Sequence, residues 1–368
     1  MTATVHVYGA GSIGNHLTYA CRKKNWEVTV IDLDIAALDR MRSSIYPSRY
    51  GTWDSSIRLA TSDKLAGPSP DVVIIGTPPD SHLKVAFEVL RRSAPKVMCI
   101  EKPLCTPDLS QCDHLDALAS EKGTVILTGY NHTMVPASFA ALDQIRAGVL
   151  GTPLTAIAEF REYWGGIFDA HPWLSGPSDS YLGFWRRGGG ASGEHSHAIN
   201  IWQFFARAVG AGRITEVGAL LDYSDPHGAA YDRLCQLHIR TEGRLAGIIV
   251  QDVITQPSRK WARLQGDNGF LEWYVNYQKD EDRIIYGRAG ADAEHLAFAK
   301  TRPDDFKGEI DHIDRLLDGV DRPTDSPMHV HRGLETMLVI AAAHRSAAVR
   351  KSVYIDYSKG WTEKALTH

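Results

Sequence analysis

Six residues near the N-terminus have the spacing of a phosphate-binding loop. Gly9-Ala10-Gly11-Ser12-Ile13-Gly14 reads GxGxxG and lies between an apolar run (5–8) and a segment with helical apolar spacing (13–22). In a strand–turn–helix, the glycines permit a tight turn, a close approach of the backbone to a pyrophosphate, and close helix packing. Alone, the string also fits a glycine-rich turn. In this context it predicts a dinucleotide bound by Gly9, Gly11, Ser12, Ile13 and Gly14.

Asp32 lies 23 residues after Gly9, at the end of the β-branched run 27–32. A carboxylate there accepts hydrogen bonds from ribose hydroxyls and repels a 2′-phosphate. Because no Arg or Lys follows immediately, the sequence favours NAD over NADP. The alternative role for Asp32 is a plain cap at the strand end.

Two further loops follow predicted strands. Residues 77–82 (TPPDSH) follow the run 71–76, and Glu101-Lys102-Pro103 ends the run 96–101. Ligands gather at the carboxyl ends of parallel strands. Lys102 is therefore a solvated loop charge or an active-site base. We expect cofactor contacts from these loops at Thr77, Pro78, His82, Glu101 and Lys102.

The order of the predicted elements defines two domains. Up to residue 128, strands alternate with helices, which is typical of a parallel α/β sheet. After 129, successive strands occur without helices between them, which predicts an α+β domain with a large, mostly antiparallel open sheet. We expect a dinucleotide-binding Rossmann domain over 1–128. Residues 129–368 then form the substrate-binding and oligomerisation domain.

Composition excludes several classes of protein. The chain has 368 residues, 43% of them apolar, and a net charge of −4, which disfavours a nucleic-acid partner. No run of 18 apolar residues and no signal peptide are visible, so no membrane association is expected. Five cysteines without CxxC pairing indicate reduced thiols. We therefore expect a cytoplasmic protein.

The motifs together resemble the Gfo/Idh/MocA oxidoreductase family (glucose-fructose oxidoreductase and inositol dehydrogenase-like). GAGSIG, Asp32, TPPDSH and EKP occur in the family's order, followed by residues 145–151, three glycines at 188–190, and Glu309 with His312 and Gly319. The resemblance implies NAD as cofactor, a catalytic Lys102 and a cis Lys102–Pro103 bond. Beside a cationic nicotinamide, partial burial lowers the pKa of such a lysine, which then handles the proton of the reacting hydroxyl.

The second catalytic segment departs from the family pattern. The family usually places an Asp four residues before a catalytic His and another three after it. Here His197 is followed by Asn200, but Gly193 stands four before it. Glu194, three before, could orient the imidazole from the same helix face. Alternatively, His195 faces the substrate from a loop. Because H-x-H in a helix start does not bring both rings together, no metal is expected.

Aromatic and basic residues between 161 and 187 suggest a rim for a sugar ring. Core packing and a solvated basic turn are the alternative for Tyr163, Trp164, Trp173, Phe184, Trp185, Arg186 and Arg187. An arginine of this set could pair with a carboxylate or phosphate on the substrate. Gln251, Asp252, Arg259 and Lys260 flank strands near the pocket. We expect substrate contacts from Lys102, Trp164, His171, Trp173, Arg186, His195 and His197.

These residues favour reversible oxidation of a secondary alcohol on a sugar, cyclitol or sugar derivative. One alternative is a keto-sugar or imine reductase. Another is a glycoside-cleaving enzyme that oxidises the sugar transiently and recycles NAD. A third, outside enzymes, is a ligand-sensing protein on the same fold, against which Lys102 and His197 argue. We expect a homodimer or homotetramer through the open sheet.

Overall fold

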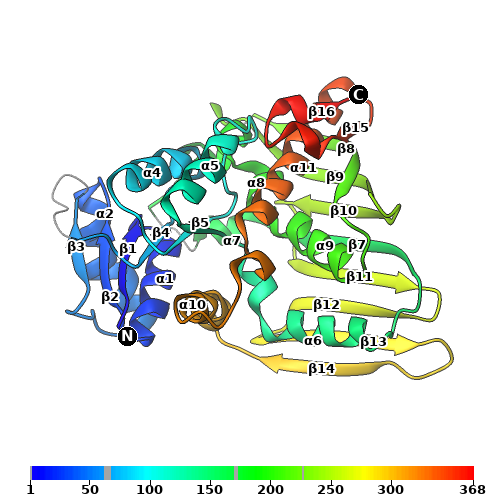
Figure 1. The fold of residues 1–368 in the computed structure, drawn as a ribbon, viewed down its shortest axis with the longest axis horizontal. Coiled ribbons are helices and arrows are strands. Elements are labelled where there is room, and N and C mark those ends of the chain that lie inside the picture. Colours follow the sequence, from blue (N-terminus) through cyan, green and yellow to red (C-terminus); the bar gives the residue numbers. More distant parts are fainter. Residues whose placement is uncertain (1, 62–67, 170–172, 226–227) are drawn as a thin grey trace.

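The computed structural model describes residues 2–61, 68–169, 173–225 and 228–368. Two β-sheets dominate it (Figure 1). Sheet A has six parallel strands in the order β3-β2-β1-β4-β5-β6, which is the doubly wound Rossmann order. Its strands are β1 (Thr4–Tyr8), β2 (Glu27–Ile31), β3 (Arg58–Ala60), β4 (Val72–Ile75), β5 (Val97–Glu101) and β6 (Val125–Gly129).

Sheet A is covered on both faces, as its nearly continuous aliphatic strands require. Alternate residues of β4 and β5 belong to different cores: Val73 and Ile100 to one, Ile74 and Cys99 to the other. The covering helices of this part of the chain are α1 (Ser12–Lys23), α2 (Ile35–Arg40), α3 (Tyr46–Tyr50), α4 (Pro79–Arg92) and α5 (Cys112–Lys122). A π-helical turn (Met41–Ile45) joins α2 to α3.

Sheet B has ten strands, ordered β14-β13-β12-β11-β7-β10-β9-β8-β15-β16. Its neighbours are antiparallel except for β7 and β10, which confirms the predicted fold class. The central strands are β7 (Pro153–Arg161), β8 (Ile214–Ser224), β9 (Tyr231–Thr241), β10 (Ala246–Asp252), β11 (Arg259–Gly266), β12 (Gly269–Gln278) and β13 (Glu281–Arg288). The remaining strands of sheet B are the edge strands β14 (Glu294–Ala299) and β16 (Leu366–Thr367) and, next to β16, β15 (Val353–Ile355). These three strands, like β3, are absent from the sequence prediction.

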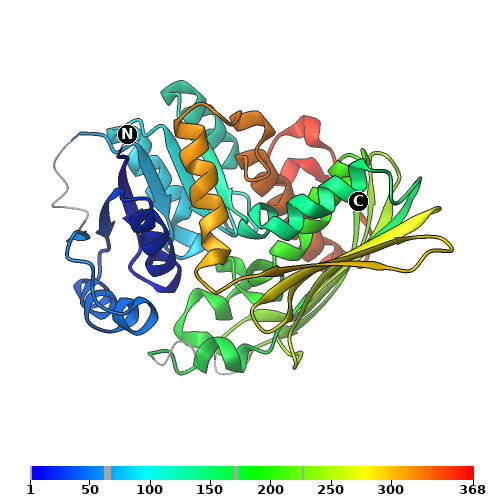
Figure 2. The same cartoon turned by 90° about the horizontal axis from the view of Figure 1, so that it is seen from below.

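One face of sheet B carries helices α6 (Pro136–Arg146), α9 (His197–Ala208) and α11 (Val330–Val349), and the other face is open in the described chain (Figure 2). Two short helices, α7 (Trp164–Asp169) and α8 (Gly190–Glu194), lie between β7 and α9 in sequence. The apolar side chains under α9 and α11 form one continuous core with α4, α5 and half of sheet A. The two sheets are therefore joined through buried side chains.

Helix α10 (Asp304–Leu317) returns to the first sheet after β14 and packs beside α1 (Figures 1 and 2). Phe306, Ile310 and Ile313 complete the core that contains β1 and β2. We propose that the Rossmann domain spans residues 1–128 and the second domain residues 129–368. Helix α10 then belongs to the second domain in sequence and completes the core of the Rossmann domain.

Candidate active site

The glycine loop has the shape that a dinucleotide requires. Gly9 has φ +103°, and a Cβ there would lie 2.7 Å from the carbonyl oxygen of Gly76. A Cβ on Gly14 would lie 1.9 Å from the Gly9 carbonyl oxygen, so the helix start admits only glycine. A Cβ added to Gly11, by contrast, would meet no other described residue within 4 Å apart from its chain neighbours. The loop is thus tightly packed on its inner side and open where a pyrophosphate approaches, which fits NAD.

Asp32 holds this loop from the end of β2. Its Oδ2 accepts a hydrogen bond from the Ala10 N–H at 2.8 Å, and Oδ1 accepts one from the Asp34 N–H at 2.9 Å. Each carboxylate oxygen can accept a second hydrogen bond. Asp32 therefore caps the turn and keeps acceptor capacity for ribose hydroxyls.

His82 joins the two remaining ligand-edge loops. It is fully buried, and its ring nitrogens contact the carbonyl oxygens of Thr77 (2.7 Å) and Pro103 (3.0 Å). The Lys102–Pro103 bond is cis. The sequence predicts a cofactor contact for His82. Because the protein uses both of its nitrogens, we propose instead that His82 positions the loop that carries Lys102.

Glu101 is the last residue of β5 and is buried beside Gly129, whose missing side chain leaves room for it. Its Oε2 accepts a hydrogen bond from the Lys102 N–H at 3.2 Å. Burial raises the pKa of Glu101 to about 7, against the opposing charge of Lys102. Glu101 is thus a buried carboxyl group directly beside Lys102.

Among the described residues, Glu194 alone holds the ammonium of Lys102. Nζ donates to the backbone carbonyl of Glu194 at 2.8 Å and to its Oε2 at 3.1 Å. The side chains are 12% and 21% exposed. The structure therefore brings a lysine of the Rossmann sheet and a carboxylate of α8 together at the ligand edge.

Glu194 does not orient His197 as the sequence suggested. Helix α8 ends at Glu194, residues 195–196 form a turn, and α9 begins at His197. The two residues therefore lie on different helices, and the expected i, i+3 face does not exist. Within the described chain, the carboxylate of Glu194 pairs with Lys102 and makes no hydrogen bond to His197.

His195 lies in that turn, buried among four charged side chains. Its Nε2 has no hydrogen-bond partner among the residues that the structure describes. Burial, with the charge of Lys260, lowers the pKa of His195 to about 4, while Glu194 and Glu162 oppose the shift. Lys260 and Glu162 form an ion pair at 3.0 Å. The imidazole is thus neutral at physiological pH and adjoins two paired lysines.

His197 begins α9 and keeps partial exposure. Its ring contacts His132 (centroids 4.6 Å apart), Tyr130 and Phe160. Its Nδ1 is buried and has no hydrogen-bond partner in the described part of the chain. Burial lowers the pKa of His197 well below its usual value, and the charges of Lys102 and Lys260 act in the same direction. His197 is therefore a second neutral imidazole beside Lys102.

Helix α8 is fixed by buried polar contacts from sheet B. Asp232 accepts hydrogen bonds from the Ser192 N–H (2.7 Å) and hydroxyl (3.1 Å). Gly190 has φ +76°, and a Cβ there would lie 2.0 Å from the Asp232 carboxylate. Gln251 donates to the carbonyl of Ser192 at 3.2 Å. These contacts set the position of Glu194 and His195.

Several predicted substrate residues lie elsewhere. The prediction that Trp164 contacts the substrate is wrong, because Trp164 is buried in a small core. Its backbone N–H donates to the Val253 carbonyl, and its ring packs on Tyr231 with the centroids 4.5 Å apart. The guanidinium of Arg186 lies over Trp185, which stacks on His344 of α11, and its contact with the substrate stays a prediction. Trp173 is 40% exposed, and His171 lies outside the described residues.

The other flanking residues separate into structural and candidate roles. Arg187 bonds to Asp80 at 2.6 Å, and its guanidinium lies over the Phe184 ring. Asp252 pairs with Arg161 and Arg259 with Glu159. Tyr163 is half exposed. Of the flanking strand residues, Lys260 interacts electrostatically with both histidines and Gln251 supports α8.

Sequence reasoning missed Glu162, His132 and Asp232. Glu162 directly follows strand β7, and His132 lies three residues after the end of β6. Their positions just beyond a strand are the signal that could have identified them. Asp232 is found only through its contact with Ser192, 40 residues away. Among the described residues, no group of three or more His, Cys, Asp or Glu side chains could hold a metal.

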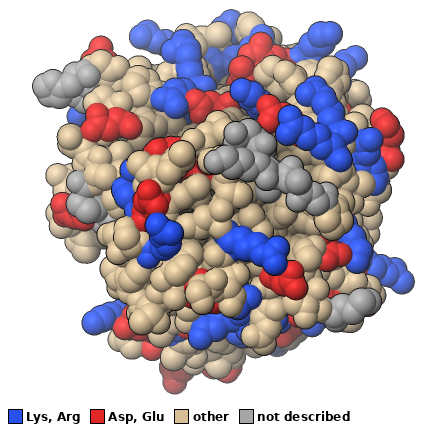
Figure 3. Space-filling view, turned by 90° about the vertical axis from the view of Figure 1, so that its left-hand side faces the viewer, with Lys and Arg blue, Asp and Glu red and all other residues tan. Residues whose placement is uncertain are grey.

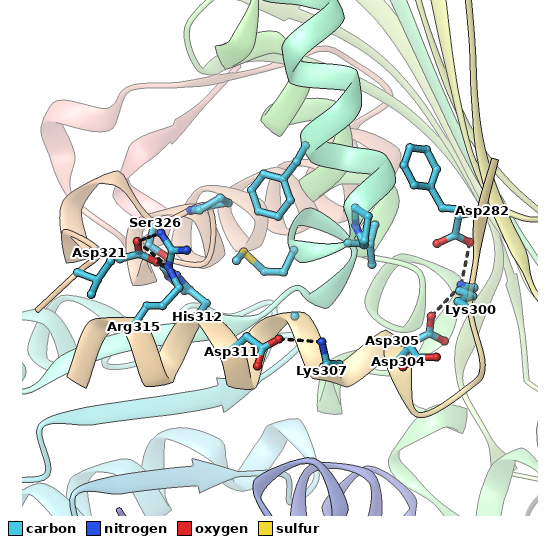
Figure 4. Close-up of a pocket in the computed structure, with 18 of the residues that line it drawn as sticks. Asp282, Lys300, Asp304, Asp305, Lys307, Asp311, His312, Arg315, Asp321 and Ser326 are labelled. Atoms are coloured by element: carbon cyan, nitrogen blue, oxygen red, sulfur yellow. Dashed lines mark hydrogen bonds and ion pairs between the residues drawn. The ribbon is translucent and has the colours of Figure 1, made fainter. Parts of the chain in front are cut away.

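A cavity of about 970 Å³ lies elsewhere, between α10 and α6 (Figure 4). Its charged side chains are largely paired: Lys300 with Asp282 and Asp305, and Lys307 with Asp311. Its one histidine, His312, lies between Asp321 and Ser326. Because these charged groups pair with one another, the described residues of this cavity hold no group of side chains comparable to the one around Lys102.

Comparison with known proteins identifies the fold of the first domain. Residues 3–130 match the GFO_IDH_MocA model, described as an oxidoreductase family with an NAD-binding Rossmann fold. The uncharacterized oxidoreductase YhhX of Escherichia coli (strain K12) is 29% identical over 168 residues, 45% of this chain. The match spans 46% of that relative, under half of its length.

Solved structures share the fold over 96% of the chain. Aldose-aldose oxidoreductase from Caulobacter crescentus, complexed with glycerol, has a TM-score of 0.76 at 16% identity, covering 100% of that chain. A levoglucosan dehydrogenase with NADH and levoglucosan has a TM-score of 0.75 at 17% sequence identity. A putative myo-inositol dehydrogenase from Sinorhizobium meliloti 1021 has a TM-score of 0.72 at 20% sequence identity. Each of these two is covered to 99%.

The N-terminal domain is thus an NAD-binding Rossmann domain. The match over residues 3–130 confirms the resemblance to the Gfo/Idh/MocA oxidoreductases that was drawn from the motifs.

Proposed function

We propose that the protein is an NAD-dependent oxidoreductase that reversibly oxidises a secondary alcohol on a sugar, cyclitol or sugar derivative. The observation that carries this proposal is the contact of Lys102 with Glu194, beside two neutral histidines and at the same sheet edge as the glycine loop. The similar structures that are titled as sugar and inositol dehydrogenases support the substrate class.

Bound NAD supplies the acceptor for the hydride that leaves the carbinol carbon. The chain's own residues manage the hydroxyl proton. We propose that Lys102 donates a hydrogen bond to the reacting oxygen while the neutral imidazole of His197 accepts its proton, and that both steps reverse during reduction. Glu194 positions the ammonium, and His195 borders it.

The charges around the site favour a neutral substrate. Lys102 pairs with Glu194, Lys260 with Glu162, and Arg187 with Asp80. Recruiting one of these cations for a carboxylate or phosphate would leave its own carboxylate unpaired. Within the described residues the charges around Lys102 therefore fit hydroxyl groups better than a charged sugar acid.

The open face of sheet B supports a homodimer or homotetramer. Ile157, Ile248 and Trp261 share this face with the ion pair Arg263–Glu272. The mixture of apolar side chains and paired charges is typical of an association surface. Size-exclusion chromatography with light scattering gives the mass directly, and a monomer at micromolar concentration would reject this part of the proposal.

Nucleic acid and membrane are not proposed as partners. Acidic and basic side chains are interspersed on the face formed by the Rossmann end (Figure 3). No helix among the described residues is long and apolar enough to cross a bilayer.

A screen at 340 nm of NAD and NADP against polyols, sugars and sugar acids tests the function. We expect NADH formation with a neutral polyol or sugar. Consumption of a glycoside without net NADH would indicate transient oxidation instead. Ligand binding with no turnover in either direction would identify a binding protein.

A further inference from the structure

Arg49 lies against the first residue of the helix that follows the glycine loop. From α3, its Nη1 donates to the Ser12 carbonyl at 3.0 Å and its Nη2 to the Ser12 hydroxyl at 2.9 Å. Ser12 directly follows Gly11, above which the structure is open. The sequence places Arg49 37 residues from Ser12, and no spacing rule predicts this contact.

The guanidinium is half-buried without a carboxylate partner in the described chain. Burial lowers the pKa of Arg49, the charge of Arg302 acts in the same direction, and the Tyr50 hydroxyl opposes the shift. A partly desolvated cation of this kind is stabilised by an anion.

Neighbouring side chains hold Arg49 rigidly. Its Nη1 also lies 3.3 Å from His16 Nε2, and His16 Nδ1 bonds to the Tyr50 hydroxyl. Burial, with the charges of Arg302 and Arg49, lowers the pKa of His16 to about 3, so the neutral ring can accept at Nε2. His16 stacks on Phe306 at 4.6 Å and Tyr50 on Tyr19 at 3.9 Å.

These contacts leave part of the guanidinium free. Arginine carries five N–H donors. Three face Ser12 and His16, so one on Nη2 and the one on Nε remain without a protein acceptor in the described chain. Two donors of a planar fork match two oxygens of a phosphate group.

We propose that Arg49 binds the pyrophosphate of the cofactor, together with the backbone N–H groups at the start of α1. This inference rests on the proposed function only in that NAD is the ligand. It assigns the arginine to the pyrophosphate rather than to a ribose 2′-phosphate, because Asp32 marks the ribose end and makes no ion pair with Arg49.

Isothermal titration of the full chain with NAD, ADP and adenosine tests the inference without turnover. For Arg49→Gln we expect NAD and ADP affinity to fall about 10- to 100-fold, the range of a lost charge-assisted hydrogen bond, with adenosine within about twofold. Arg49→Lys keeps the charge without the fork and should lie in between. Arg91→Gln, which alters an exposed arginine of α4, is the control and should change nothing.

Comparing ADP with adenosine in one variant separates binding from folding. Equal losses for both ligands, or a lowered thermal midpoint in Arg49→Gln without rescue by Arg49→Lys, would show that Arg49 only ties α3 to α1 and would overturn the inference. Unchanged NAD and ADP affinity would overturn it too. Either result would leave the proposed oxidation of polyols standing, since that rests on the 340 nm screen.

Discussion

Replacing Glu194 by glutamine tests how Lys102 is held. The change keeps the shape of the side chain and the backbone contact at 2.8 Å but removes the charge that faces Nζ at 3.1 Å. Both side chains are largely buried, so solvent screens the pair only partly. A hydrogen bond to a charged group contributes about 1.5–3 kcal/mol. Because the contact between Nζ and the backbone carbonyl of residue 194 survives, we expect a loss at the lower end of this energy range. It corresponds to about a tenfold to thirtyfold decrease in kcat.

The assay is hydride transfer at 340 nm with the best polyol of the screen, in a double-mutant cycle. Glu194→Gln should add little to Lys102→Met, because the carboxylate acts through the ammonium, and it should add fully to His197→Ala. Glu242→Gln, which breaks an exposed pair with Arg213, serves as the matched control and should leave kcat unchanged. Full additivity with Lys102→Met, or coupling to His197 instead, would refute this reading of the structure.

Three further outcomes are expected. Calorimetric titration should show tighter binding of NAD than NADP, and Asp32→Ala should narrow the difference; tighter binding of NADP to the parent would contradict this. His197→Ala should lower kcat by about 10²–10⁴-fold, as loss of a general acid–base group does, whereas His195→Ala should cost far less; the reverse order would make His195 the proton acceptor. Thermal midpoints should fall steeply from pH 6.5 to 4.5, because five buried histidines have pKa values near 3 or 4 in the folded chain. In the unfolded chain their pKa values are near 6.5, so the unfolded chain binds more protons in this window. Each histidine then lowers the free energy of unfolding by up to about 1.4 kcal/mol per pH unit. Four buried carboxyl groups with raised pKa values, Glu101 and Asp232 (both to about 7), Asp282 and Glu309, act in the opposite sense but are fewer than the histidines. A flat midpoint across this window would contradict the burial of His16, His82, His132, His195 and His344.

The parts of the site that the sequence predicts well are set by local chemistry. Gly9 and Gly14 can be recognised because their own backbones exclude a side chain. Asp32 and Lys102 can be recognised because each directly follows a strand. The alternation of strands and helices likewise defines sheet A, since each crossover is short and local.

The parts that the sequence does not predict depend on contacts between distant segments. The break between α8 and α9 separates Glu194 from His197, and the residue types at these positions do not predict a helix end there. Trp164 is equally suited to a rim or a core, and its burial depends on Tyr231, 67 residues away. The return of α10 to the first sheet cannot be read from its own apolar face, which would pack as well on sheet B.

The most direct test of the central claim is a single-turnover stopped-flow measurement. NAD-loaded protein is mixed with the best polyol, and absorbance at 340 nm is followed with and without the Lys102→Met change. We expect a rise in the parent, visible even if the oxidation is transient, and a rate at least about 100-fold lower in the variant with NAD affinity within about threefold. A variant that transfers hydride within threefold of the parent would contradict the assignment of Lys102, and with it the active site described for this chain.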